Sequence, residues 1–416
     1  MKRILSILAL ALVLASCGKN DFHIGKTFNE NDLLGIWALT TYVTDDYSVY
    51  QDMPVATEFT ADHKGVQRAF NDIDEFCWSL SGNSLSLAWT NGNPAADFEL
   101  LEMGKERMSY LSYWGSPVPY HEYYVNISRL LPGTWKVVMP GFADYIVNID
   151  SSGNSTWQNV EGGSLMSVDW SLKTSNETPY AIIQLDGVNV SFDDTYHILS
   201  ASASSLVANN KNNGYVYFYK ISGRLKFNDS DLFGIWVCTK MIASDGDTSY
   251  DRPLTHTFAA DHTGNSRYYV SPYNYSWGLA DDRLVFSNEN MPTVRINSLD
   301  GLHLCTTEEE EGSSYYLYFS KLDKLLTGNW KVIWGGDPLY NVTISADGTS
   351  KWQDLSAKET YSYNWKLSSS DDFYNPVLLF ENELGSGLFV IWSASDDVLV
   401  TTIHRSSDID VKFIRE

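Results

Sequence analysis

Leu34-Gly35-Ile36-Trp37 begins a pattern that occurs four times in this chain of 416 residues. In each copy a Gly-x-Trp step begins a strand-like run, and a second tryptophan follows later in a Trp-x-Leu step. The two tryptophans are 41 residues apart in the first and third copies and 35 residues apart in the second and fourth. This spacing indicates four modules in the order A-B-A-B, made by duplicating a two-module unit. We expect a structural role for all eight tryptophans: Trp37 with Trp78, Trp135 with Trp170, Trp236 with Trp277, and Trp330 with Trp365.

The repeats divide the chain into modules of roughly 95 residues, a size that buries one small core. The predicted boundaries are 32–129 for module A1, 130–222 for B1, 231–321 for A2 and 325–416 for B2. Almost no linker separates the two modules of a pair, since Arg129 runs straight into Leu130. We therefore expect a fixed contact between the modules within each pair.

Short alternating apolar and polar runs, separated by tight turns, predict an all-β fold in every module. Turns such as Ser81-Gly82-Asn83 place glycine or asparagine where a positive φ is needed. The pattern shows no helical period. Eight short strands joined by hairpins describe an up-and-down antiparallel meander, and closure into a barrel removes its free edges. The sequence thus predicts four tandem small up-and-down antiparallel β-barrels.

The first residues form a targeting segment that is excluded from the fold. Lys2-Arg3 is followed by an apolar run from Ile4 to Leu14, too short for a stable membrane span. Leu14-Ala15-Ser16-Cys17 then resembles the bacterial lipobox. This resemblance implies that residues 1–16 are a lipoprotein signal peptide, that Cys17 is lipidated, and that 17–31 tether the first module. Gly18 after the cysteine favours the outer membrane, with the periplasmic or cell-surface face left open.

The formal net charge is −23, and it becomes −25 when Lys2 and Arg3 are removed with the signal peptide. A surface this acidic repels nucleic acid and anionic membrane, so we exclude nucleic acid as a partner. The membrane would be contacted through the lipid at Cys17 alone.

The repeated motifs resemble the lipocalin-like domains of Bacteroidetes lipoproteins, as four tandem copies over nearly all of the mature chain. The resemblance rests on the Gly-x-Trp opening, the first hairpin with Asp-x-x-Gly or Asp-Gly, the Trp-x-Leu strand, and closing strands such as Ile127-Ser128-Arg129. It implies that the first tryptophan of each copy lies in the first strand at the closed end of a barrel. Lipocalins are half as long again and enclose a ligand, whereas a barrel of eight short strands is about filled by its own side chains.

Residues for catalysis or metal binding show no recognisable pattern, and we predict no catalytic site, no metal and no cofactor. His63 and His262 occupy equivalent hairpin positions and are interpreted as turn residues. The acidic runs around Asp245 and Glu308 lack the spacing of a calcium loop and are interpreted as solvated hairpin tips. Cys238 and Cys305 share module A2 and are either buried thiols or a disulfide.

Aromatic residues outside the repeated scaffold are the candidates for binding. The favoured function is a non-enzymatic envelope lipoprotein that binds a glycan or a protein through these side chains. One alternative is that they fill contacts between modules, and another is a carrier with a hydrophobic ligand inside a barrel. A third is an enzyme with no recognisable motif, which predicts carboxylates and a histidine meeting between modules. The candidates are Tyr113, Trp114, Tyr120, Tyr123, Tyr269, Tyr273 and Trp334.

Overall fold

The computed structural model describes most of the chain from Phe28 to Glu416. The described residues are 28–113, 119–160, 165–186, 194–210, 214–221, 227–250, 254–268, 271–280, 282–288, 291–310, 313–368, 375–383, 385–403 and 406–416. The predicted signal peptide, Cys17 and most of the predicted tether therefore lie outside them. None of the helices among the described residues has the length and apolar character needed to span a membrane.

Four closed antiparallel barrels follow one another along the chain, which confirms the predicted fold class. Neighbouring strands in the sequence pair in space, and the last strand of each module pairs with its first. The first barrel consists of β1 (Gly35–Val43), β2 (Val49–Gln51), β3 (Val55–Phe59), β4 (Lys64–Ala69), β5 (Asp72–Ser81), β6 (Ser84–Trp89), β7 (Ala96–Met103), β8 (Arg107–Ser112) and β9 (Tyr120–Asn126). The second consists of β10 (Gly133–Val138), β11 (Tyr145–Ile149), β12 (Asn154–Asn159), β13 (Leu165–Ser175), β14 (Thr178–Asp186), β15 (Asp194–Ala201), β16 (Ser205–Asn210) and β17 (Gly214–Lys220).

The second pair repeats this arrangement. The third barrel consists of β18 (Gly234–Ala243), β19 (Thr248–Ser249), β20 (Thr255–Phe258), β21 (Thr263–Tyr268), β22 (Ser271–Ala280), β23 (Arg283–Phe286), β24 (Val294–Leu299), β25 (His303–Glu310) and β26 (Ser313–Lys321). The fourth consists of β27 (Gly328–Trp334), β28 (Asp337–Ile344), β29 (Thr349–Asp354), β30 (Thr360–Ser368), β31 (Val377–Asn382), β32 (Gly385–Ala394), β33 (Val398–Ile403) and β34 (Ser406–Arg415). In the first and third barrels the short extra strand, β2 or β19, pairs with the far half of the opening strand.

One-turn helices, which the sequence pattern did not predict, plug one end of each barrel. They are α2 (Glu30–Leu33), α3 (Ile127–Leu130), α4 (Asp229–Leu232) and α5 (Leu322–Leu325). A helix of four residues is too short to show a helical period in the sequence. Each lies immediately before a Gly-x-Trp step, whose glycine has a φ between 122° and 145° and so turns the chain from the plug into the first strand.

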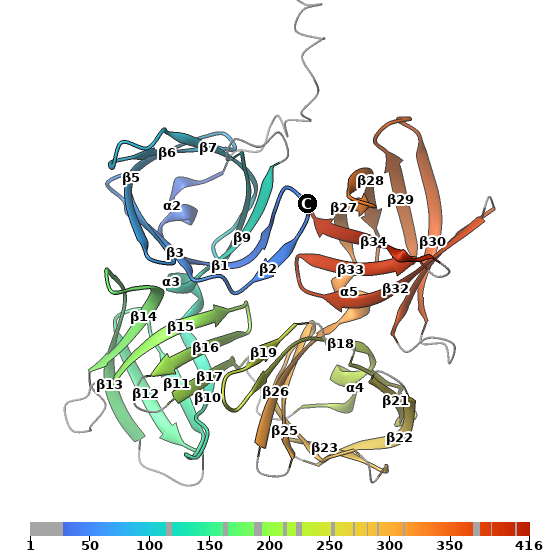
Figure 1. The fold of residues 1–416 in the computed structure, drawn as a ribbon. Helices are drawn as coiled ribbons and strands as arrows, with labels where there is room; N and C mark the ends of the chain where they lie inside the picture. Colours follow the sequence, from blue (N-terminus) through green and yellow to red (C-terminus); the bar gives the residue numbers. More distant parts are fainter. Residues whose placement is uncertain are drawn as a thin grey trace, which may run out of the picture.

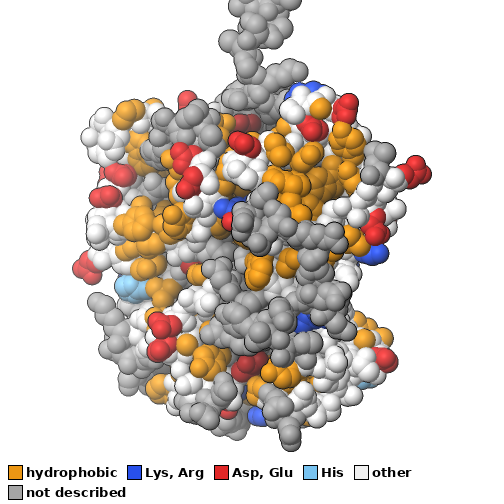
Figure 2. Space-filling model, turned by 45° about the vertical axis from the view of Figure 1, so that its right-hand side comes forward, with side chains coloured by type: hydrophobic (Ala, Val, Ile, Leu, Met, Phe, Trp, Pro, Cys, Tyr) orange, Lys and Arg blue, Asp and Glu red, His pale blue; other side chains and the backbone are white. Residues whose placement is uncertain are grey.

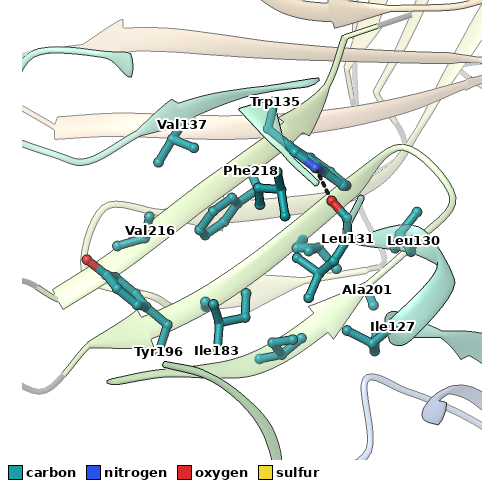
Figure 3. Packing of buried hydrophobic residues seen from close by; sticks show 14 of the residues in the cluster. Ile127, Leu130, Leu131, Trp135, Val137, Ile183, Tyr196, Ala201, Val216 and Phe218 are labelled. Atoms are coloured by element: carbon teal, nitrogen blue, oxygen red, sulfur yellow. Dashed lines mark hydrogen bonds between the residues drawn. The ribbon is translucent and has the colours of Figure 1, made fainter. Parts of the chain in front are cut away.

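The first tryptophan of every module is completely buried and donates a hydrogen bond to the plug. The indole Nε1 of Trp37 lies 2.7 Å from the carbonyl oxygen of Leu33. The same bond to the residue four positions earlier measures 2.7 Å for Trp135, 2.6 Å for Trp236 and 2.8 Å for Trp330. Figure 3 shows it in the second barrel, where Trp135 and Leu131 lie among Ile127, Leu130 and Phe218. The bond satisfies two buried polar groups at once, which fixes the plug against the barrel.

A cation from the end of the closing strand covers the same tryptophan in three of the barrels. Lys220 lies over Trp135 at 5.7 Å, and Lys321 lies over Trp236 at 5.4 Å. Arg415 lies 4.3 Å over Trp330 and also donates to the carbonyl of Leu325 at 2.6 Å. The cation therefore binds the face of the indole and the end of the helix together.

The second tryptophan of each copy packs against its barrel core, but at different depths in the A and B modules. Trp78 and Trp277 are only 4 % exposed and lie in the barrel cores, but Trp170 and Trp365 are half-buried at the closed end. In the second and fourth barrels the inner position is taken by Trp157 and Trp352, which are 3 % and 6 % exposed. These two belong to the strand before the Trp-x-Leu step, so the interior differs between the A and B barrels.

The four barrels form a ring, as Figure 1 shows, and each contacts the next. Within a pair, the outer face of β1 packs with α3 against the core of the second barrel, and β18 with α5 does the same for the fourth. Between pairs, Tyr217 stacks on Tyr316 at 3.8 Å. The ring is completed by Val43 and Tyr123 of the first barrel, which pack against Ile333 and Ile414 of the fourth.

The plug bond gives a first testable prediction. Trp135→Phe keeps an aromatic ring but leaves the fully buried carbonyl of Leu131 without its donor, which costs about 1–3 kcal/mol. We expect this loss in the free energy of unfolding from urea titrations followed by circular dichroism. Trp392→Phe is the control, because Trp392 is 48 % exposed, and it should change the free energy by less than about 0.5 kcal/mol. Equal effects of the two substitutions would contradict the role assigned to the plug.

Candidate functional site

The fourth barrel has a hollow at the end opposite its plug. The cavity measures about 350 Å³, which lies within the size range of pockets that bind small molecules. Six consecutive strands, β27 to β32, contribute to its wall. The lining residues are Trp334, Tyr340, Trp352, Asp354, Tyr361, Tyr363, Phe380, Asn382, Gly385, Ser386, Gly387 and Phe389.

Aromatic rings form most of the wall of this cavity. Trp352 packs edge-on against Phe380 at 4.8 Å and against Tyr340 at 5.5 Å, and its ring is nearly parallel to that of Phe389 at 6.1 Å. Tyr363 approaches Trp352 from the next strand at 5.9 Å. Because these side chains alternate along their strands, they all point to the inside of the barrel.

Polar groups lie at the rim and are held by local hydrogen bonds. Asn382 Oδ1 accepts from the amide of Gly385 at 3.0 Å. Backbone and side-chain donors at Ala357 and Ser356 lower the pKa of Asp354. The hydroxyl of Tyr361 donates to Glu359, which raises the pKa of Tyr361 to about 12 and keeps it protonated. The site is therefore apolar and aromatic inside and polar where it meets water.

The second barrel is the natural comparison, because it carries the same B-type repeat. The pairing of Trp170 with Leu185 and of Trp365 with Phe380 aligns the two sheets. At four positions of the wall, aliphatic or methionine side chains in the second barrel correspond to aromatic ones in the fourth. These pairs are Met139 and Trp334, Met166 and Tyr361, Val168 and Tyr363, and Leu185 and Phe380. Three other wall residues, Tyr340, Trp352 and Phe389, have aromatic counterparts in the second barrel, which are Tyr145, Trp157 and Tyr196. The fourth barrel thus extends an aromatic wall that the second barrel has only in part.

Figure 2 shows hydrophobic side chains gathered in a continuous patch at the upper right, where the fourth barrel comes forward. Acidic side chains lie around this patch. An apolar surface bordered by charge is typical of a binding site.

The predicted binding aromatics that belong to the described residues are distributed over three barrels and do not form one platform. Trp334 lies at the mouth of the fourth barrel, half-buried and edge-on to Phe389 at 6.2 Å. Tyr273 is 39 % exposed on β22 of the third barrel. Trp114 and Tyr269 lie outside the described residues.

The first barrel holds the other three candidates. Tyr113 is 41 % exposed, and Tyr120 is half-buried with its ring stacked on Tyr42 at 5.6 Å. Tyr123 requires a correction, because it is only 4 % exposed and its hydroxyl donates to the backbone of Arg415 at 2.8 Å. It fills the contact between the first and fourth barrels, which is the alternative role for such aromatics. Three residues that line the cavity of the fourth barrel were not among the binding candidates from the sequence: Trp352, Tyr361 and Tyr363. A comparison of the two B modules, position by position, would have singled out the two tyrosines.

A second, smaller cavity lies where the four barrels meet. It measures about 120 Å³ and takes residues from every barrel. On one side Arg107 of the first barrel binds Asp396 and Asp397 of the fourth, and His303 of the third contacts Asp396 at 3.2 Å. Carboxylates and a histidine thus converge between modules, the arrangement expected of the enzyme alternative. In this cavity, however, the carboxylates bind cations of neighbouring barrels, which is the arrangement of a structural ion cluster.

Burial and charge together set the protonation of this cluster. Burial alone would lower the pKa of His303, but hydrogen bonds and charges from Asp300 and Asp396 outweigh it and raise the pKa to about 10. Burial alone would raise the pKa of Asp396, but His303 and Arg107 lower it to about 2. Burial raises the pKa of Asp397 in spite of Arg107. His303 is therefore a cation at neutral pH and links the third and fourth barrels.

The remaining sequence candidates are structural. Cys238 and Cys305 are both buried free thiols, and burial raises the pKa of Cys305 to about 12. His63 and His262 have φ values of 60° and 62° in their hairpins, and each lies against the second tryptophan of its barrel. The described residues contain no cluster of three or more side chains suited to a metal ion.

Comparison with known proteins identifies no family. No family model matches the sequence, and no curated protein matches it. A protein of unknown function from the DUF3598 family of Nostoc punctiforme aligns over 93 % of this chain and 97 % of its own, with 8 % identity and a TM-score of 0.17. Hsv2 of Kluyveromyces lactis aligns over 83 % and 98 %, with 8 % identity and a TM-score of 0.11. Similarity this low supports no conclusion about fold or function.

The pKa of His303 predicts a pH dependence of stability. A folded pKa above the ordinary 6.5 means that the contribution of His303 is complete below pH 6.5 and is lost as the pH rises through about 10. We expect His303→Gln to be less stable than the wild-type chain at pH 6 and nearly equal to it above pH 10, in thermal unfolding across this range. A difference between the two proteins that does not change with pH would contradict the ion pair.

Proposed function

We propose that the chain is a lipid-anchored binding protein of the bacterial cell envelope. Its ligand would be a small, largely apolar molecule with a flat ring, taken into the mouth of the fourth barrel. This is the carrier alternative from the sequence, with the site placed in one barrel of the four. The lipid anchor at Cys17 rests on the lipobox, and the lipocalin-like resemblance agrees with a ligand inside a barrel.

The aromatic cavity of about 350 Å³ is the observation that carries this proposal. Rings arranged edge-to-face around a hollow provide both flat faces and edges, against which a planar ligand packs with about 0.5–1.5 kcal/mol per aromatic contact beyond its area burial. The half-buried Trp334, Tyr340, Tyr361 and Tyr363 lose further exposure when a ligand enters. Burial of this apolar surface is the driving force.

The polar rim suits a ligand that keeps one hydrogen-bonding group near water. Asn382 and the protonated hydroxyl of Tyr361 border the opening. The strong negative charge of the chain disfavours ligands with several negative charges. A neutral or singly charged ring compound therefore fits this site best.

The second candidate function is the one that the sequence favoured: binding of a glycan or a protein through exposed aromatic side chains. It is supported by Tyr42, Tyr50, Tyr113 and Tyr120 in the first barrel, of which Tyr50 is 48 % exposed. Binding by this surface would be lost in Tyr50→Ala or Tyr113→Ala and would survive changes in the fourth barrel. Neither candidate requires catalysis, a metal or a cofactor.

The comparison between the two B barrels supplies the test of the first candidate. Tyr361→Met with Tyr363→Val installs the side chains that the second barrel carries at these positions. Loss of two aromatic contacts should weaken the binding of N-phenyl-1-naphthylamine, an apolar fluorescent probe, about tenfold. The measurement is a fluorescence titration of the full chain.

Tyr273→Met is the matched control, since it removes an exposed tyrosine from the third barrel. It should leave the probe affinity unchanged. The proposal fails if the wild-type chain does not bind the probe, or if the double variant binds it as tightly as the wild-type chain. Circular dichroism of each variant establishes that the barrels remain folded.

A further inference from the structure

The turns between β15 and β16 and between β32 and β33 have the same pattern of hydrogen bonds, and both line the small central cavity. The amide of Ser202 donates to the carbonyl of Ser205 at 2.8 Å, and the amide of Ser395 donates to that of Val398 at 2.8 Å. In each turn the first serine hydroxyl accepts from the amide two residues on, at 3.3 Å. Ser202-Ala203-Ser204 therefore corresponds, residue by residue, to Ser395-Asp396-Asp397.

The two turns carry different side chains into this common geometry. In the fourth barrel, the carboxylate of Asp397 binds Arg107 and accepts a hydrogen bond from Thr41 at 3.4 Å, both from the first barrel. The second barrel has Ser204 at the position of Asp397, and Ser204 is only 7 % exposed. At this position of the turn, the fourth barrel therefore has a buried carboxylate and the second barrel has a short hydroxyl.

The strands that face these turns, β1 and β18, also differ at one equivalent position. Thr41 pairs with Tyr123 in the first barrel, and Lys240 pairs with Tyr318 at the same register in the third. The ammonium of Lys240 donates to Asp52 at 2.8 Å and also to the hydroxyl of Ser200. An ammonium has three N–H donors, of which these two acceptors take two; the nitrogen also lies 5.3 Å from the ring of Tyr318 and 6.0 Å from that of Tyr250, which both line the cavity.

The cavity has room for a further acceptor. Its volume of about 120 Å³ is that of a molecule with a few heavy atoms, and its wall includes residues 200–205, Lys240 and Tyr250. The carboxylates that line it, Asp52, Asp396 and Asp397, each bind a cation already. The side chains of Lys240 and Asp52 are only 13 % and 15 % exposed, and charge-assisted hydrogen bonds between groups this buried are stronger than on an open surface.

We propose that the central cavity binds a small carboxylate of two to four carbons. Its carboxylate group would lie against Lys240 and the hydroxyl of Ser204, on the side of the ring where Ser204 takes the place of Asp397. The short carbon chain would fill the rest of the cavity. Such a ligand would join the second and third barrels as Asp397 joins the fourth and first, independently of any ligand in the mouth of the fourth barrel.

Thermal unfolding of the full chain in sodium acetate tests this site, with sodium chloride at the same ionic strength as the reference. Acetate should raise the melting temperature in a saturable way, as a ligand of the folded state does. Sodium phosphate should raise the melting temperature no more than sodium chloride does, because the proposed ligand is a carboxylate. The proposal is overturned if acetate has no saturable effect, or if phosphate matches it.

Ser204→Asp supplies the carboxylate from the chain itself. This variant should melt higher than the wild-type chain in chloride and should lose the response to acetate. Ser204→Val fills the proposed carboxylate position without a charge and should also lose the response to acetate. This second variant keeps the test decisive if Ser204→Asp does not fold. Ser152→Asp, in an exposed turn of the second barrel, is the control and should keep the response. An acetate response that survives Ser204→Val would contradict the placement of the ligand.

Discussion

The indole hydrogen bond to the plug is the interaction on which the rest of the structure depends. It occurs once in each barrel, between a fully buried tryptophan and the carbonyl four residues earlier, at 2.6–2.8 Å. A buried carbonyl at the end of a one-turn helix needs a donor, and a buried indole needs an acceptor. Their pairing closes one end of each barrel with local chain only. The other end is free to vary, and the pairs are free to pack into a ring.

Duplication of a two-module unit explains how one scaffold carries different surfaces. The contacts between the second and third barrels and between the fourth and first use corresponding positions, such as Tyr318 and Tyr123. On this common frame the fourth barrel has additional aromatic residues in its wall, and the central turns carry Asp396-Asp397 in one half and Ala203-Ser204 in the other. Differences between equivalent positions are therefore the best indicators of function in this chain.

The sequence was sufficient to predict the four barrels, because Gly-x-Trp, the hairpin turns and strand alternation are local signals repeated in register. It could not predict the plugs, since four residues carry no helical period. Nor could it distinguish Tyr123 from an exposed aromatic, because an outward-facing strand residue meets either water or a neighbouring barrel. Trp334 stood out from the sequence as a residue without a counterpart, but the hollow beside it depends on how six strands and their rings pack. Whether these side chains fill the barrel or leave a hollow depends on their combined volumes and orientations, which residue types alone do not determine.

Hydrogen exchange of the indole N–H groups tests the central claim most directly. In a ¹⁵N-labelled chain, the indole signals of Trp37, Trp135, Trp236 and Trp330 should exchange only when their barrels unfold, far more slowly than that of Trp392, whose indole donates to Thr402 in an exposed pair. Exchange of any of these four at a rate close to that of Trp392 would show that its plug opens independently of the barrel, and would contradict the claim that the bond between indole and plug holds each barrel closed.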